Sequence, residues 1–300
     1  MKRNLFKSLI LCVLLGYGMN IRAQEKFPLW PQGPKESNRL KDSVTMNDEG
    51  CLRNNSEAEL FVYHPAEGNN TGMSVLICPG GGYTQLSMKQ EGELFARWLT
   101  ERGITAFVLQ YRMPNGHSKI PLTDAARALR WVRSRTEEWD LKPNKIGIAG
   151  FSAGGHLAST LATHFNGGDS RDTDRLERLS CRPDFVLLFY PVISMTNGLT
   201  HSGSKKALLG KNPSAQLIHL YSNERHITAH TPPTFIIHCD DDATVSSLNS
   251  IAYYQALKQH KVPEVLYIFP QGGHGWGLWN HFEYYPQWTN LLAKWLKKIE

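Results

Sequence analysis

The stretch Lys145–His164, KIGIAGFSAGGHLASTLATH, decides the fold class of this chain. It opens with an apolar run at 145–149 that is typical of a buried strand, and it closes with a helical pattern from Ala153. Between them lies Gly150-Phe151-Ser152-Ala153-Gly154, a serine on a tight turn. A nucleophilic serine that stands clear of a sheet on such a turn needs very small residues two positions before and after it. We therefore predict that Ser152 is a nucleophile presented at the end of a strand.

Strand and helix patterns alternate on both sides of this stretch. Apolar runs predict strands at Leu60–Tyr63, Ser74–Cys78, Ala106–Gln110, Lys145–Ala149, Phe185–Tyr190, Thr234–Cys239 and Val265–Phe269. Helical periodicity predicts helices at Glu91–Arg102, Leu122–Glu137, Ala153–His164, Val245–His260 and Gln287–Ile299. Alternation of this kind, with continuous apolar strands, indicates an α/β fold with a mostly parallel sheet covered by helices on both faces.

Two segments depart from this alternation. Residues 24–53 are polar and rich in proline, which predicts an irregular N-terminal cover. Residues 194–231 contain short helical patterns at Lys205–Leu209 and Ser214–Leu220, so they form either a small cap over the sheet edge or a decorated crossover. We assign residues 24–300 to a single domain, a length that is common for one α/β unit.

The first 23 residues are typical of a secretory signal peptide. A basic start precedes an apolar run, Leu9–Met19, which is too short to span a membrane, and Ala23 offers a small residue for cleavage. The whole chain has 33 basic and 27 acidic residues, a net charge of +6. Without this segment, 29 basic residues face 27 acidic ones, which favours neither nucleic acid nor a membrane as a partner. We expect a secreted or periplasmic protein.

A serine hydroxyl needs a base to accept its proton and a carboxylate to orient that base. His274 lies in a glycine-rich loop directly after a predicted strand, so we expect it to be the base, whereas His238 and His156 are expected to be structural. Three adjacent acids at 240–242 follow another strand end. Spacing alone leaves Asp240 and Asp242 nearly level as the orienting acid.

A second glycine-rich loop, Cys78-Pro79-Gly80-Gly81-Gly82-Tyr83, follows the strand at 74–78. Consecutive glycines let backbone N–H groups point inward, which an oxyanion hole requires. We predict an oxyanion hole formed by Gly81 or Gly82 together with the N–H of Ala153, the residue after the nucleophile. No lysine and hydroxyl pair follows the glycines as in a phosphate-binding loop.

No metal, nucleotide or flavin site is indicated, and no cofactor is expected. The four cysteines outside the signal segment show no Cys-x-x-Cys spacing, which argues against structural zinc. Cys78 and Cys239 end apolar runs and are expected in the core as free thiols. A bridge between Cys51 and Cys181 is conceivable in an exported protein.

From Leu60 onward, the chain resembles serine esterases of the α/β-hydrolase superfamily, in the group that includes bacterial polysaccharide acetyl esterases and hormone-sensitive-lipase-like enzymes. The glycine loop carries Pro79 where lipase-like relatives have His, which resembles the acetyl-esterase form. The acid loop of such families has His, then Asp four positions later, then Val. His238, Asp242 and Val245 match this pattern, with Ser246 in place of the usual Pro. The resemblance therefore implies a triad of Ser152, Asp242 and His274.

The resemblance implies hydrolysis of acetyl esters on plant polysaccharides such as xylan, with an acetylated polysaccharide or oligosaccharide as the partner. The aromatic residues Tyr83, Trp276 and Trp279 lie near the glycine loop and the base in sequence, and we expect Tyr83 and Trp276 to bind the sugar. Alternatives are a feruloyl or short-chain lipase-like esterase, a dipeptidyl-peptidase-like hydrolase, or a carbohydrate-binding protein without catalytic activity.

Overall fold

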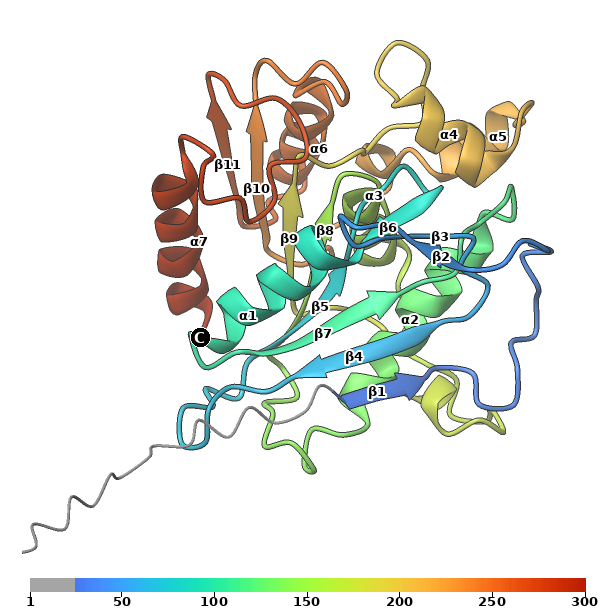
Figure 1. The fold of residues 1–300 in the computed structure, drawn as a ribbon, viewed down its shortest axis with the longest axis vertical. Coiled ribbons are helices and arrows are strands. Elements are labelled where there is room, and N and C mark those ends of the chain that lie inside the picture. The colour runs from blue at the N-terminus through green and yellow to red at the C-terminus, as the bar shows by residue number, and fades with distance from the viewer. Residues whose placement is uncertain (1–24) are drawn as a thin grey trace, which may run out of the picture.

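The computed structural model describes residues 25–300, and the predicted signal segment lies outside the described residues. An eight-stranded sheet forms the centre, in the order β1-β4-β7-β5-β8-β9-β10-β11 (Figure 1). The strands are β1 (Glu25–Pro28), β4 (Glu59–Tyr63), β5 (Ser74–Cys78), β7 (Thr105–Gln110), β8 (Ile146–Phe151), β9 (Phe185–Phe189), β10 (Thr234–Cys239) and β11 (Glu264–Phe269). The β1–β4 and β4–β7 pairs are antiparallel and all other pairs are parallel. The predicted mostly parallel sheet is confirmed.

Helices cover both faces of this sheet. They are the π-helix η1 (Met88–Glu93), α1 (Leu94–Thr100), α2 (Lys119–Arg133), α3 (Ala153–His164), η2 (Leu176–Arg178), α4 (Ser202–Leu209), α5 (Ala215–Leu220), η3 (Asn223–Arg225), α6 (Leu248–Gln259) and α7 (Tyr285–Ile299). Apolar residues of α1 and α7 belong to one core cluster, and those of α2, α3 and α6 belong to the other. Figure 1 shows α1 and α7 in front of the sheet and α2 and α3 behind it.

The helix predicted at Glu91–Arg102 is instead two segments, with η1 preceding α1. The π-helical segment packs closely on β7, because a Cβ atom at Gly92 would lie 2.8 Å from Val108 Cγ1. π-Helical turns inside α-helical segments are often found at functional sites.

The N-terminal segment is more regular than predicted. Within it, β1 pairs with the edge of the central sheet, while β2 (Thr45–Met46) and β3 (Cys51–Arg53) form a small antiparallel sheet with β6 (Gln85–Ser87). Backbone pairing with an edge strand does not require an apolar sequence, so composition alone could not indicate it.

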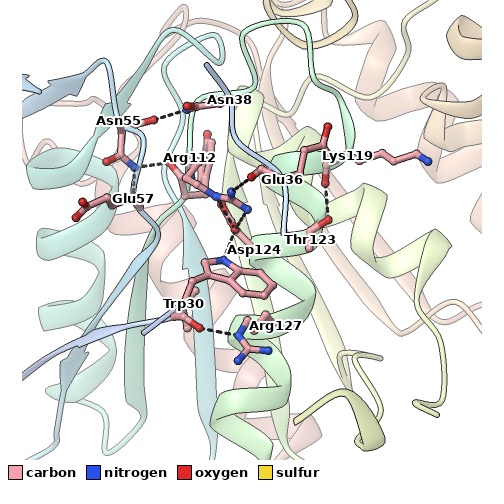
Figure 2. A network of polar contacts seen from close by, with 12 residues as sticks. Trp30, Glu36, Asn38, Asn55, Glu57, Arg112, Lys119, Thr123, Asp124 and Arg127 are labelled. Atoms are coloured by element: carbon pink, nitrogen blue, oxygen red, sulfur yellow. Dashed lines mark hydrogen bonds and ion pairs between the residues drawn. The ribbon is translucent and has the colours of Figure 1, made fainter. Parts of the chain in front are cut away.

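A buried ion pair fastens the N-terminal segment to the domain (Figure 2). Arg112 follows β7, and its guanidinium donates to both carboxylate oxygens of Asp124 on α2 at 2.6–3.0 Å. The Trp30 indole donates to Asp124 at 2.8 Å, and Arg112 also donates to the carbonyl of Glu36 at 2.6 Å. Both members of the pair are almost completely buried. This network therefore joins the N-terminal cover to the sheet and to α2.

The segment 194–231 contains α4, α5 and η3, so both predicted helices are present. It packs on α3, where the Asn223 side chain donates to the carbonyl of His156 and to Ser159 Oγ. Within residues 25–300, no helix is both long and apolar enough to cross a membrane.

All four cysteines of the described chain are free thiols, so the bridge considered between Cys51 and Cys181 is not formed. Cys78 and Cys239 are fully buried in the core, as predicted. Burial raises the pKa of Cys239 to about 12, and such a thiol behaves as a small apolar residue.

Candidate active site

Ser152 lies on a strained turn between β8 and α3. Its backbone has φ 52° and ψ −118°, a conformation that residues other than glycine rarely adopt. The positions two residues before and after it must be glycine, because a side chain there would clash with the backbone. A Cβ atom at Gly150 would lie 2.1 Å from the carbonyl oxygen of Gly154, and one at Gly154 would lie 2.0 Å from that of Cys78. The turn thus presents the hydroxyl at the carboxyl edge of the sheet.

Three side chains from distant loops meet at this edge. Ser152 Oγ lies 2.8 Å from His274 Nε2, and His274 Nδ1 lies 2.6 Å from Asp242 Oδ2. Because a carboxylate only accepts, the proton of a neutral His274 lies on Nδ1 and leaves Nε2 free to accept from Ser152. Ser152 is 7% exposed and His274 is partly exposed, so the chain of hydrogen bonds reaches the surface at the imidazole.

The structure separates the three adjacent acids. Asp240 is exposed and accepts a hydrogen bond from Ser247, the residue before α6. Asp241 accepts from the backbone N–H groups of Gly272 and Gly273, in the loop that carries the histidine. Only Asp242 contacts the imidazole. Each acid therefore has a different structural role.

Asp242 is held as a carboxylate by a set of donors. Burial would raise its pKa, but hydrogen bonds from His238, His274 and the N–H of Val245 outweigh burial and hold the pKa well below its usual range. His238 Nε2 also lies 2.9 Å from the carbonyl of Val245, which places its proton on that nitrogen. His238 is thus a buried structural residue, as expected, and it positions the acid.

The predicted oxyanion loop lies beside the serine. Gly81 and Gly82 have φ +129° and +64°, and a Cβ at Gly81 would lie 2.2 Å from the carbonyl oxygen of Gln85. Among the described residues, the N–H groups of Gly81, Gly82 and Ala153 have no hydrogen-bond acceptor. Ala153 begins α3, whose first N–H groups have no partner within the helix and carry its positive dipole end. These donors suit an oxygen that develops negative charge.

The two residues expected to bind sugar are buried, so that prediction is wrong. Tyr83 and Trp276 are each only 2% exposed. The Tyr83 hydroxyl is hydrogen-bonded to His156 at 2.8 Å, and Trp276 stacks on Phe282 at 4.6 Å between ring centres. Both rings fill the core behind the site. Trp279, by contrast, is 46% exposed.

His156 packs behind the elbow, as expected. It is completely buried, with Nε2 2.8 Å from the carbonyl of Tyr221 and Nδ1 2.8 Å from the Tyr83 hydroxyl. Burial lowers its pKa to about 4, so the ring is neutral. Both ring nitrogens have partners, which makes His156 a structural group.

Comparison with known proteins identifies the family. The sequence profile of BD-FAE matches residues 60–257, more than half of the chain and all of the elbow and acid loop. The chain belongs to the BD-FAE family. A solved structure of an acetyl ester-xyloside bifunctional hydrolase from Caldicellulosiruptor lactoaceticus shares 42% sequence identity with this BD-FAE chain at a TM-score of 0.78, covering 92% of this chain and 96% of that one. The predicted α/β-hydrolase fold and the resemblance to acetyl esterases are confirmed.

Curated relatives of this BD-FAE chain are longer proteins. An acetylxylan esterase from Xylanibacter ruminicola is 36% identical over 86% of the chain, and endo-1,4-beta-xylanase B from Butyrivibrio fibrisolvens is 38% identical over 72%. The chain spans 51% of the first protein and 34% of the second.

Two residues of the BD-FAE chain that contact this site were not predicted from the sequence. Glu91, on η1, is buried and accepts a hydrogen bond from the N–H of Gly80. Tyr190, directly after β9, packs its ring against His274 at 4.8 Å between ring centres. The predicted strand Phe185–Tyr190 ends at Tyr190, and this position at a carboxyl strand end is the only signal in the sequence that points to it.

Proposed function

We propose that the chain is a serine esterase that removes acetyl groups from xylan or from oligosaccharides derived from it. The observation that carries this proposal is the hydrogen-bonded chain from Ser152 through His274 to Asp242, on a strained elbow beside free backbone donors. The acetylxylan esterase among its relatives supports the choice of ester.

In the proposed mechanism, Ser152 Oγ attacks the carbonyl carbon of the acetyl ester while its proton passes to His274 Nε2. Asp242 keeps the imidazole in the right tautomer and stabilises its cationic form. Collapse of the tetrahedral intermediate breaks the bond to the sugar oxygen, which takes the proton from His274. Water then attacks the acetyl-enzyme and gives a proton to His274. The second intermediate collapses by breaking the bond between the acetyl carbon and Ser152 Oγ, which takes that proton back from His274, and the acetate product leaves.

The oxyanion of both tetrahedral intermediates is assigned to the N–H groups of Gly81 or Gly82 and of Ala153. These groups are already oriented by the glycine loop and by the start of α3, so little reorganisation is needed as the negative charge develops. Loss of one such donor typically costs about 10²–10³-fold in kcat.

For the sugar, the exposed aromatic residue Trp279 is the proposed stacking platform. It follows His274 by five residues, and its backbone closes a turn with the carbonyl of Trp276. Aromatic faces suit the apolar face of a sugar ring. A polymeric substrate of this kind is consistent with the predicted export of the protein.

The test is release of acetate from acetylated xylan, compared with feruloyl esters, long-chain acyl esters and a dipeptide amide. We expect acetate release by the wild type, and a loss of roughly 10⁴–10⁶-fold in kcat for Ser152→Ala. Preference for long acyl chains or for the amide would replace the proposed substrate. Failure of a fluorophosphonate to label Ser152 would favour a binding protein without catalytic activity.

A further inference from the structure

A buried carboxylate lies directly behind the oxyanion loop. Glu91 is 5% exposed, and its Oε2 accepts a hydrogen bond of 2.6 Å from the N–H of Gly80. Its other oxygen, Oε1, accepts one of 2.9 Å from the Tyr190 hydroxyl. Among the described residues, no Lys or Arg forms an ion pair with Glu91. A carboxylate buried in this way is costly, so its retention calls for a reason.

Tyr190 extends this contact to the loop of the base. Its hydroxyl accepts a hydrogen bond of 3.0 Å from the N–H of Gly277, while its ring packs edge-on against His274. The backbone of Tyr190 has φ +37°, a strained value for a residue with a side chain. Glu91 is therefore bonded on one side to the glycine loop and, through one tyrosine, to the histidine loop on the other.

We propose that Glu91 is a positioning residue for the reaction, which orients the oxyanion loop and the base loop together. This inference rests on the proposed esterase function. Gly80 is followed immediately by the two glycines assigned to the oxyanion hole, and its N–H is committed to Glu91. With that peptide anchored beside Ser152, the two glycines that follow it have less freedom to move.

The packing around Gly80 shows how little freedom this loop has. A Cβ at Gly80 would lie 2.6 Å from the carbonyl oxygen of Phe151, 2.8 Å from Glu91 Oε2 and 2.9 Å from Ser152 Cβ. Gly80 therefore lies between the Glu91 carboxylate and the nucleophile, with no room for a side chain of its own. The π-helical turn η1 is the element that brings Glu91 to this position.

The charge of Glu91 adds to this geometry. Burial raises the pKa of Glu91 above its usual value, and the hydrogen bonds from Gly80 and Tyr190 and the proximity of His274 offset this rise only in part. A negative charge at this place favours the cationic imidazole that forms when Ser152 loses its proton.

Two substitutions separate orientation from charge. Glu91→Gln keeps an oxygen that accepts from Gly80 and removes the charge, while its amide group would reverse the bond with the Tyr190 hydroxyl, which now donates to Glu91. Glu91→Ala removes both contacts. Glu93→Gln is the matched control, because Glu93 lies two residues away on the same turn and forms an exposed ion pair with Arg97.

Active sites are counted with a fluorophosphonate, and kcat per site and KM are measured on an aryl acetate, together with the rate of inactivation. We expect kcat per site to fall roughly 10-fold for Glu91→Gln and about 10²–10³-fold for Glu91→Ala, with KM changed less than about 3-fold. The inactivation rate should fall in parallel, because the phosphonate oxygen occupies the same oxyanion hole. Glu93→Gln should stay within about 2-fold of the wild type.

A purely structural carboxylate would give a different result. Glu91→Gln would then lower the midpoint of thermal unfolding or the fraction of labelled sites, while kcat per labelled site stayed at the wild-type value. That result would overturn the inference even if Glu91→Ala did not fold. A wild-type protein that neither reacts with the fluorophosphonate nor hydrolyses the aryl acetate would instead refute the proposed function.

Discussion

Replacement of Asp242 by Asn tests the orientation of the base most directly. Asp242 Oδ1 accepts hydrogen bonds from the N–H groups of Thr244 and Val245 at 2.9 and 2.8 Å. These two donors would hold the amide oxygen of an Asn at the same position. The amide nitrogen would then take the place of Oδ2, 2.6 Å from His274 Nδ1 and 3.2 Å from His238 Nε2.

An amide nitrogen at that place forces the wrong tautomer on the base. It carries hydrogens, so His274 can bond to it only through an unprotonated Nδ1, and the imidazole proton then moves to Nε2. A protonated Nε2 cannot accept the proton of Ser152. We expect Asp242→Asn to lower kcat by about 10⁴-fold, a loss of about 5 kcal/mol in transition-state stabilisation.

The assay is hydrolysis of an aryl acetate per labelled active site, with circular dichroism to verify folding. Asp240→Asn is the control, because Asp240 is exposed and its carboxylate accepts a hydrogen bond from Ser247, and we expect it to remain within about 3-fold of the wild type. Retention of kcat within tenfold by a folded Asp242→Asn protein would refute the tautomer argument. Loss of activity in Asp240→Asn instead would show that the acid is wrongly assigned.

Other consequences of the structure can be measured separately. Trp279→Ala should raise KM about 10-fold on acetylated xylo-oligosaccharides but not on an aryl acetate; equal effects on both would exclude stacking. Asp124→Ala leaves Arg112 buried without its partner and should lower the free energy of unfolding by about 3–5 kcal/mol in urea titrations. Gly150→Ala should destabilise the elbow by about 2 kcal/mol and abolish labelling by a fluorophosphonate, whereas normal labelling would contradict the contact of 2.1 Å. His156 stays neutral when folded down to about pH 4, while the unfolded imidazole is protonated below about pH 6.5. Stability should therefore fall on acidification by about 1.4 kcal/mol per pH unit in this range, and His156→Gln should flatten that slope.

The sequence by itself was enough to predict the sheet and the elbow. The strands Ser74–Cys78 and Thr234–Cys239 have the same bounds in the structure as in the prediction. A strand of a parallel sheet that is buried on both faces needs apolar residues at nearly every position, and such a run can be recognised without knowledge of the rest of the chain. The glycines around Ser152 are equally local, since the turn itself requires them.

Only the tertiary structure decided which groups surround the serine. The separate roles of Asp241 and Asp242 depend on a loop that is 31 and 32 residues away from them in sequence, as the Asp241–Gly272 and Asp242–His274 bonds show. The same holds for Tyr83 and Trp276, whose aromatic rings suit a sugar or a core equally well until their neighbours are known. Glu91 is the clearest case, because an isolated glutamate on a helical pattern is normally solvated. Glu91 is buried because Gly80 and Tyr190 fold against it and donate to its carboxylate. Which distant segments surround a polar side chain decides whether it is buried, and a local sequence pattern does not contain that information.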